Sequence, residues 1–208
     1  MSPASEPTHF ERVWYCAYGS NMSAERLAYY LVGGQPDGAD RTYVGCREPE
    51  IPADQRTIRV PHQLYFAKHS RNWNGGVAFV APGRSDESGA WCVARLVTSR
   101  QLADLCSQEC GRNGADLELD DAVQELFIDL STAELGVGDL RNLRSSGWYR
   151  SALVVAPIDG VPAVTLTSSA REQPTRPTVP YIDWIRKGLR EAGLREAEVD
   201  AYLAAAQR

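Results

Sequence analysis

The chain has 208 residues, of which 43% are hydrophobic and 24% are charged, a balance typical of a globular domain with an apolar core. Its net charge of −5 argues against the basic face that a nucleic-acid-binding protein usually carries. No apolar run reaches the roughly 20 residues that a membrane-spanning helix needs. We therefore expect neither a nucleic acid nor a membrane as partner.

The first twelve residues are polar and contain Pro3 and Pro7, and they lack the basic and apolar regions of a secretory signal. We interpret residues 1–12 as a disordered leader and residues 13–208 as a single domain. The five cysteines are odd in number and irregularly spaced, which is typical of reduced thiols in the cytoplasm. They form no metal-ligand pattern with the three histidines, so we expect no metal.

Strand, helix and turn signals alternate along the domain. They predict strands at 13–18, 62–67, 76–81, 89–97, 148–157 and 162–167, and helices at 24–31, 99–110, 181–192 and 196–207. The region 39–60 is predicted to be loop-rich with one short strand at 42–46, and 139–144 to be helical. Residues 123–130 fit a strand or a short helix. Strands followed by closing helices favour an α+β fold or a small β-barrel with flanking helices.

The first strand ends in an unusual turn, Tyr18-Gly19-Ser20-Asn21. Gly19 allows the backbone to approach a ligand closely, and successive N–H groups in such a turn can converge on a carboxylate. A strand-to-helix turn with Asn21 or Ser23 as helix cap explains the same residues. The turn alone leaves both interpretations open.

Four stretches, in order, resemble the γ-glutamylcyclotransferase family. They are Tyr-Gly-Ser-Asn at 18–21, Trp-Asn-Gly-Gly at 73–76, Gln-Glu at 108–109 with a glycine two residues later, and a C-terminal segment with Tyr181, Gly188 and Glu-Ala-Gly-Leu at 191–194. The resemblance covers most of residues 13–205. It implies a small mixed β-barrel with flanking helices.

The resemblance also implies an activity. Family members cyclise a γ-glutamyl amide, a small molecule, to 5-oxoproline and release an amine, without a metal or cofactor. Glu109 would be the catalytic acid/base, accepting a proton from the substrate α-ammonium and then protonating the leaving nitrogen. The implied substrate-binding residues are Tyr18, Gly19, Ser20, Asn21 and Tyr149.

The chain also departs from the family pattern. About 35 residues, 112–146, are inserted after Glu109, and we expect this insertion to form a lid or to line the leaving-amine site. Residues 35–72 are longer than expected, and the strand at 163–167 lacks a tyrosine. The loop has Asn21 where the glutathione-specific branch has Leu, which argues against glutathione. The leaving amine and the oligomeric state stay open.

Three other functions remain possible from the sequence. One is a non-catalytic binder of a carboxylate-bearing small molecule, which would not need Glu109. Another is an acyl-transfer relative in natural-product metabolism. The third is a thiol enzyme using Cys16, Cys106 or Cys110, which would require a nearby base to form the thiolate.

Overall fold

The computed structural model describes residues 10–36, 41–85, 89–112 and 116–207. Its strands are β1 (Arg12–Ala17), β2 (Gln55–Val60), β3 (His62–Ser70), β4 (Gly75–Arg84), β5 (Ala90–Thr98), β6 (Leu140–Asn142), β7 (Ser151–Ile158) and β8 (Val161–Thr167). Its helices are the short 3-10 turn η1 (Ser20–Met22) and the α-helices α1 (Ala24–Val32), α2 (Ser99–Glu109), α3 (Leu117–Ser131), α4 (Val179–Glu191) and α5 (Glu196–Ala206). The predicted α+β class is confirmed.

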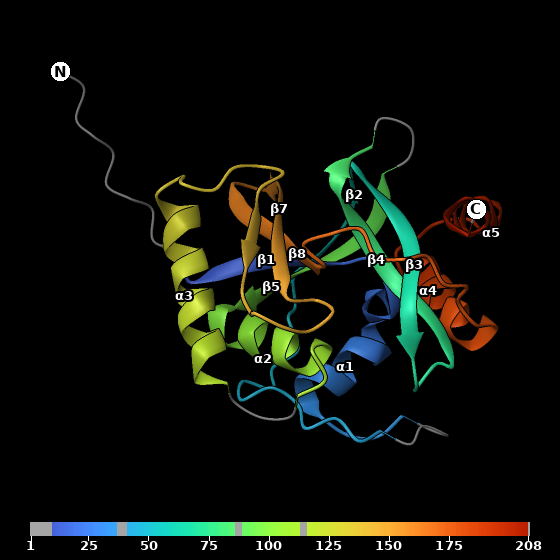
Figure 1. Cartoon of the computed structure of the whole chain (residues 1–208), viewed down its shortest axis with the longest axis horizontal. Coiled ribbons are helices and arrows are strands. Elements are labelled where there is room, and N and C mark those ends of the chain that lie inside the picture. Colours follow the sequence, from blue (N-terminus) through green and yellow to red (C-terminus); the bar gives the residue numbers. More distant parts are fainter. Residues whose placement is uncertain (1–9, 37–40, 86–88, 113–115, 208) are drawn as a thin grey trace.

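Six of the strands form one curled sheet in the order β2-β5-β1-β8-β7-β6. Neighbouring strands are antiparallel except β1 and β8, which are parallel. Strands β3 and β4 form a separate antiparallel hairpin. Within the described ranges these sheets do not close into a ring, so the expected barrel is an open curled sheet with a hairpin beside it (Figure 1).

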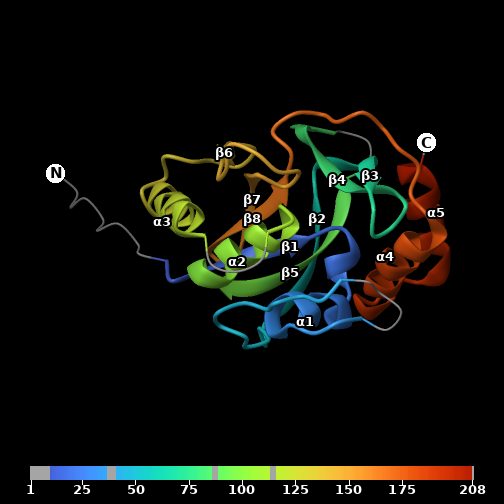
Figure 2. The ribbon, with the colours of Figure 1, turned by 60° about the horizontal axis from the view of Figure 1, so that its bottom comes forward.

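Strand β1 lies at the centre of the core because it pairs with β5 on one side and β8 on the other. Five of its six residues are buried, which explains why its sequence is a continuous aromatic and apolar run. Helices cover the sheet, with α3 at one end of the molecule and α4 and α5 at the other (Figures 1 and 2). The carboxyl end of β1 leads directly into η1, which packs against α4.

Two expectations about local structure are wrong. The prediction of a helix at 139–144 fails because Leu140–Asn142 pairs with β7 as the edge strand β6. Residues 42–46 form no strand; Tyr43 makes only an isolated bridge to Gly34. The open alternative at 123–130 is resolved as helix, since these residues belong to α3.

Strand β2 was not expected, because it carries little apolar signal. It pairs only with β5 at the edge of the sheet, and four of its six residues are exposed. The turn between β7 and β8 matches its prediction: Asp159 and Gly160 have φ of 51° and 77°, as a two-residue hairpin with positive φ at both positions requires.

The predicted leader falls mainly outside the described residues, and β1 already begins at Arg12. The predicted insertion, 112–146, contains α3 and β6. Helix α3 packs against α2. Its N-cap residue Asp116 forms an ion pair with Arg144. Arg47 forms ion pairs with both Asp120 of α3, at 2.6 Å, and Asp104 of α2, at 2.8 Å. The insertion thus supports the helix that carries Glu109.

Candidate active site

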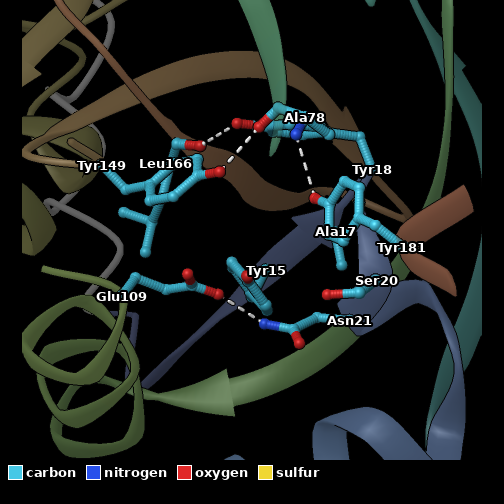
Figure 3. A pocket seen from close by; sticks show the side chains of 11 residues that line it. Tyr15, Ala17, Tyr18, Ser20, Asn21, Ala78, Glu109, Tyr149, Leu166 and Tyr181 are labelled. Atoms are coloured by element: carbon cyan, nitrogen blue, oxygen red, sulfur yellow. Dashed lines mark hydrogen bonds between the residues drawn. The ribbon is translucent and has the colours of Figure 1, made fainter. Parts of the chain in front are cut away.

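A small hollow lies at the end of β1, where η1, α2 and α4 meet β4 (Figure 3). We call it the first hollow. It is lined by Tyr15, Ala17, Tyr18, Gly19, Ser20, Asn21, Ala78, Glu109, Tyr149, Leu166 and Tyr181. All six site residues predicted from the sequence therefore line one hollow, although they come from three separate parts of the chain.

Glu109 is the last residue of α2, and the end of that helix fixes its position. The backbone N–H of Gly111 donates to Gln108 O at 3.0 Å, and that of Arg112 donates to Ser107 O at 3.0 Å. With Gly111 at φ 77°, this is a Schellman motif, which stops the helix within three residues of Glu109. At the other end of α2, Thr98 and Gln101 form a capping box.

The carboxylate of Glu109 is held from the opposite side by the loop. Asn21 Nδ2 donates a hydrogen bond to Glu109 Oε1 at 2.6 Å (Figure 3). The other polar atom of that amide, Oδ1, is buried without a hydrogen-bond partner. Because an unpaired buried acceptor is costly, this atom is available to a donor on a ligand in the first hollow.

Burial raises the pKa of Glu109 above its ordinary value of 4.5. The positive charges of Arg26 and Arg41 oppose this shift, as do hydrogen bonds to Asn21 and Tyr30, but they do not cancel it. A carboxyl group whose pKa is raised toward neutrality can both accept and return a proton. The environment of Glu109 is therefore suited to a general acid/base.

The loop at 18–21 and the start of α1 are held by two residues that the sequence analysis did not assign to the site. Arg95, 3% exposed, donates to the carbonyls of Asn21 and Met22 at 3.3 and 3.0 Å. Glu191 of α4 accepts from the Ala24 backbone at 2.7 Å. Arg95 could have been singled out from the sequence, because it is the one charged residue in the otherwise apolar strand β5.

Two glycines of this region are closely packed. At Gly19, whose φ of −107° is ordinary, an added Cβ would lie 3.2 Å from the Tyr181 hydroxyl. At Gly188 of α4 it would lie 2.5 Å from Met22 Cβ. The loop therefore sits directly on α4, which brings Tyr181 into the first hollow.

Three tyrosine hydroxyls in the wall differ in what they can offer a ligand. Tyr18 donates to Leu166 O at 2.7 Å and Tyr149 donates to Ala78 O at 2.8 Å, so both protons are engaged. Tyr181 instead accepts, from Ala78 N at 2.9 Å. Its own proton has no acceptor among the described residues. Burial raises the pKa of all three, so they remain neutral hydroxyls.

The surroundings of two of the three candidate thiols, Cys16 and Cys106, oppose formation of a thiolate. Burial raises the pKa of Cys16, and a hydrogen bond to Cys110 together with burial raises that of Cys106. The same contact lowers the pKa of Cys110. Neither His62 nor His69 lines the first hollow, and His9 lies outside the described residues. No histidine is among the groups that shift the pKa of Cys16, Cys106 or Cys110.

Within the ranges that the structure covers, no group of three or more His, Cys, Asp or Glu side chains is arranged to hold a metal ion. No helix in those ranges is long and apolar enough to cross a membrane.

The insertion contributes no described residue to the wall of the first hollow. The expectation that it forms a lid or lines the leaving-amine site stays a prediction. Its helix α3 packs against α2. Only Tyr149, which follows the insertion, reaches the wall.

Comparison with known proteins identifies the fold. An uncharacterized protein from Homo sapiens superposes with a TM-score of 0.53 and 19% sequence identity, over 94% of this chain and 88% of that one. A structure of γ-glutamyl cyclotransferase superposes equally well, at 17% identity, over 93% of this chain and 88% of that one. The fold is therefore that of the γ-glutamyl cyclotransferase-like structures.

At the level of sequence, no family model matches the chain. Histone deacetylase 5 of Arabidopsis thaliana is 31% identical over 206 residues. The match takes in 92% of this chain but only 30% of that protein, so the chain spans less than a third of the curated relative. The name of that relative describes a much larger protein.

Proposed function

We propose that the chain is an enzyme that cyclises a γ-glutamyl amide to 5-oxoproline and releases an amine. The observation that carries this proposal is the pairing of Glu109 with Asn21 at 2.6 Å in the wall of the first hollow. The γ-glutamyl cyclotransferase-like fold and the raised pKa of the carboxyl group support it. A pure binder would not need an acid/base residue.

The proposed reaction uses one carboxylate twice. Ionised Glu109 takes a proton from the substrate α-ammonium, and the freed amine attacks the γ-carbonyl carbon of the same molecule. The attack is intramolecular, so much of its entropic cost is already met. The tetrahedral intermediate then collapses as Glu109 returns the proton to the leaving nitrogen, and the C–N bond to the amine breaks. The attacking nitrogen still carries one proton more than the ring amide of 5-oxoproline, and the ionised Glu109 takes this second proton and passes it to the amine, which departs as an ammonium ion.

The wall of the first hollow supplies complementary groups for this reaction. The free hydroxyl proton of Tyr181 would donate to the carbonyl oxygen as it becomes an oxyanion. The unpaired Asn21 Oδ1 and the Tyr149 oxygen, whose proton is already engaged, would accept from the α-ammonium. Backbone groups of the loop at 18–21 would contact the α-carboxylate. No cofactor takes part in these steps, and five free thiols favour a cytoplasmic setting.

The test is release of 5-oxoproline from a panel of γ-glutamyl amides. Wild-type protein is expected to release it, and Glu109→Gln to lower kcat about 10²- to 10⁴-fold, the usual contribution of an acid/base residue. Gln keeps the size of the side chain and can still contact Asn21. Substrate binding without release by the wild type would contradict the proposal and identify a binder.

A further inference from the structure

Two cysteine thiols meet at the carboxyl end of α2. Cys106 and Cys110 are four positions apart and therefore lie on the same face of the helix. A hydrogen bond joins their side chains, so the two sulfur atoms are in contact. Both are free thiols, and Glu109 directly precedes Cys110 in the chain. The proposed cyclisation uses neither thiol.

The segment 147–149 packs against this pair. An added Cβ at Gly147 would lie 2.6 Å from Cys110 Sγ, and Cys106 Sγ lies 3.5 Å from Tyr149 O. Gly147 also has a φ of 112°, so glycine meets both the backbone conformation and the lack of space at this position. Cys110 is partly exposed, whereas the other four cysteines are buried. A small solute would therefore reach Cys110 first.

The surroundings of Cys110 favour its thiolate. The hydrogen bond to Cys106 lowers the pKa of Cys110, and the positive charge of Arg144 acts in the same direction. Burial and the charge of Glu109 oppose this shift without cancelling it. The pKa of each of the other four cysteines is raised instead. An accessible thiolate with a second thiol beside it is the usual arrangement of an oxidation-sensitive cysteine.

We propose that Cys110 and Cys106 are a modification site at which a peroxide forms an intramolecular disulfide, and that this bond moves Glu109 out of the first hollow. The Cys110 thiolate attacks one oxygen of hydrogen peroxide, the O–O bond breaks, and the sulfur becomes a sulfenic acid. The departing hydroxide takes up the proton that Cys110 has lost and becomes water.

The second thiol completes the oxidation. The sulfur of Cys106 attacks the sulfur of Cys110, the S–S bond forms and the S–O bond breaks. The oxygen leaves as water with the proton of Cys106. In total the two thiols lose two electrons, and one hydrogen peroxide is reduced to two molecules of water.

The disulfide requires the end of α2 to change. On a helix the Cβ atoms of residues four positions apart lie about 5–6 Å from each other. A disulfide joins Cβ atoms that are about 3.5–4.5 Å apart, so the last turn must distort. The backbone has left the regular helix here, since Cys110 is the C-cap with ψ 7° and Gly111 follows at φ 77°. Glu109 lies within the bridged turn and would lose its contact with Asn21.

Mass spectrometry after treatment with hydrogen peroxide tests for the disulfide. Tryptic peptide 101–112 contains Cys106 and Cys110 and no other cysteine. In wild-type protein we expect this peptide to lose two hydrogen atoms, to resist alkylation under denaturing conditions, and to return to two thiols with dithiothreitol. Cys106→Ser should stop at a sulfenic acid on Cys110, which dimedone traps. Cys46→Ser replaces a buried cysteine outside the first hollow and is the control, which should still form the bridge.

Two readouts follow the effect on Glu109. On the basis of the proposed function, the bridged protein should release 5-oxoproline about 10²-fold more slowly, as expected when an acid/base residue is lost, and dithiothreitol should restore the rate. Carbon-13 NMR of the carboxyl group, assigned by comparison with Glu109→Gln, does not depend on turnover. In the bridged protein the pKa of Glu109 should fall toward its ordinary value of 4.5, because the group leaves its buried position.

The outcomes separate the inference from the function. Two alkylated thiols in peroxide-treated wild type, or further oxidation of Cys110 without a bridge, would overturn the inference. A bridge that leaves the pKa of Glu109 unchanged would overturn the proposed movement. If the reduced protein releases no 5-oxoproline, the proposed function fails, while the peptide mass and the NMR titration still decide the inference.

Discussion

Asn21 and Glu109 are 88 positions apart in the chain, yet their side chains are joined by a hydrogen bond of 2.6 Å. Asn21 belongs to the turn that follows β1, and Glu109 is the last residue of α2. The amide N–H donates to the carboxylate, so the contact stabilises the ionised form of Glu109 and lowers its pKa. The loop thereby controls the proton affinity of the proposed acid/base residue.

Replacing Asn21 is therefore expected to move the acid limb of the pH–rate profile. In Asn21→Ala the ionised carboxylate loses a donor, so the pKa of Glu109 rises further and less of the base form exists at a given pH. The acid limb of kcat should shift to higher pH. Titration of kcat from pH 4 to 9 measures this. Arg26, Arg41 and Tyr30 also act on this carboxyl group and must be intact in the comparison. An unchanged acid limb would show that Asn21 does not act on the titrating group.

A second prediction concerns stability, because the raised pKa of Glu109 makes the folded state prefer the protonated group. The stability it contributes is complete below the unfolded pKa of about 4.5 and is lost as the pH rises through the higher folded pKa. Glu109→Gln removes that loss. The variant, which we expect to have lost activity, should equal or exceed the wild type in free energy of unfolding at pH 8.

Urea denaturation at pH 4 and pH 8 checks this prediction. The difference in stability between Glu109→Gln and the wild type should grow in favour of the variant as the pH increases. This increase is what we expect of a functional residue whose ionised form lowers the stability of the fold. If the stability of the variant relative to the wild type is instead lower at pH 8 than at pH 4, the ionised carboxylate stabilises the fold through Arg26 or Arg41.

A third prediction compares two tyrosines. Tyr181→Phe and Tyr149→Phe each remove one hydroxyl that bonds the backbone of Ala78, so each should cost a similar amount of stability, about 1–3 kcal/mol. Only Tyr181 has a proton free to reach a substrate oxygen. Its loss should therefore lower kcat about 10²-fold, while Tyr149→Phe should mainly raise KM.

Steady-state kinetics on both variants, with circular dichroism to confirm folding, distinguishes these roles. A phenylalanine keeps the ring contacts of either tyrosine. The ring centroids of Tyr149 and Phe79 lie 4.7 Å apart, and those of Tyr181 and Trp73 lie 5.2 Å apart. If the two variants lose kcat to the same extent, the loss reflects the position of Ala78 and the assignment of Tyr181 as oxyanion donor is wrong.

Local patterns in the sequence predicted β1, α2 and the closing helices, because each has the period, cap or turn residues of its element. Glu109 was singled out only through resemblance, since nothing local distinguishes it from a solvated carboxylate at a helix end. Its contact with Asn21 could not be predicted, because it depends on β1 and β5 pairing and on where α2 then ends. Single sequences carry little information on such long-range neighbours.

The misses have similar causes. Strand β2 is held at the sheet edge by pairing with β5, and its exposed polar residues leave no periodic apolar signal. Strand β6 is three residues long and exists only because β7 lies beside it. Tyr181 reaches the first hollow because Gly188, two turns further along α4, lets that helix approach Met22. Each depends on a distant partner and not on its own residues.

The contact at Gly188 leads to the last prediction. A methyl group there would lie 2.5 Å from Met22 Cβ and 2.6 Å from the backbone N of Ser23, distances at which the backbone of the loop must move. Gly188→Ala should therefore destabilise the fold by about 1–3 kcal/mol, as overpacking does. It should also lower kcat more than its stability loss explains, since Asn21 precedes Met22 directly and would leave Glu109.

The matched control is Gly83→Ala, where an added Cβ meets nothing within 4 Å. Unfolding in urea and kcat measured well below the midpoint of unfolding would be compared for both variants. Gly83→Ala should leave both quantities near wild type. If Gly188→Ala retains wild-type kcat while its stability falls, the loop can move without disturbing Glu109, and the tight packing of α4 on η1 serves the fold alone.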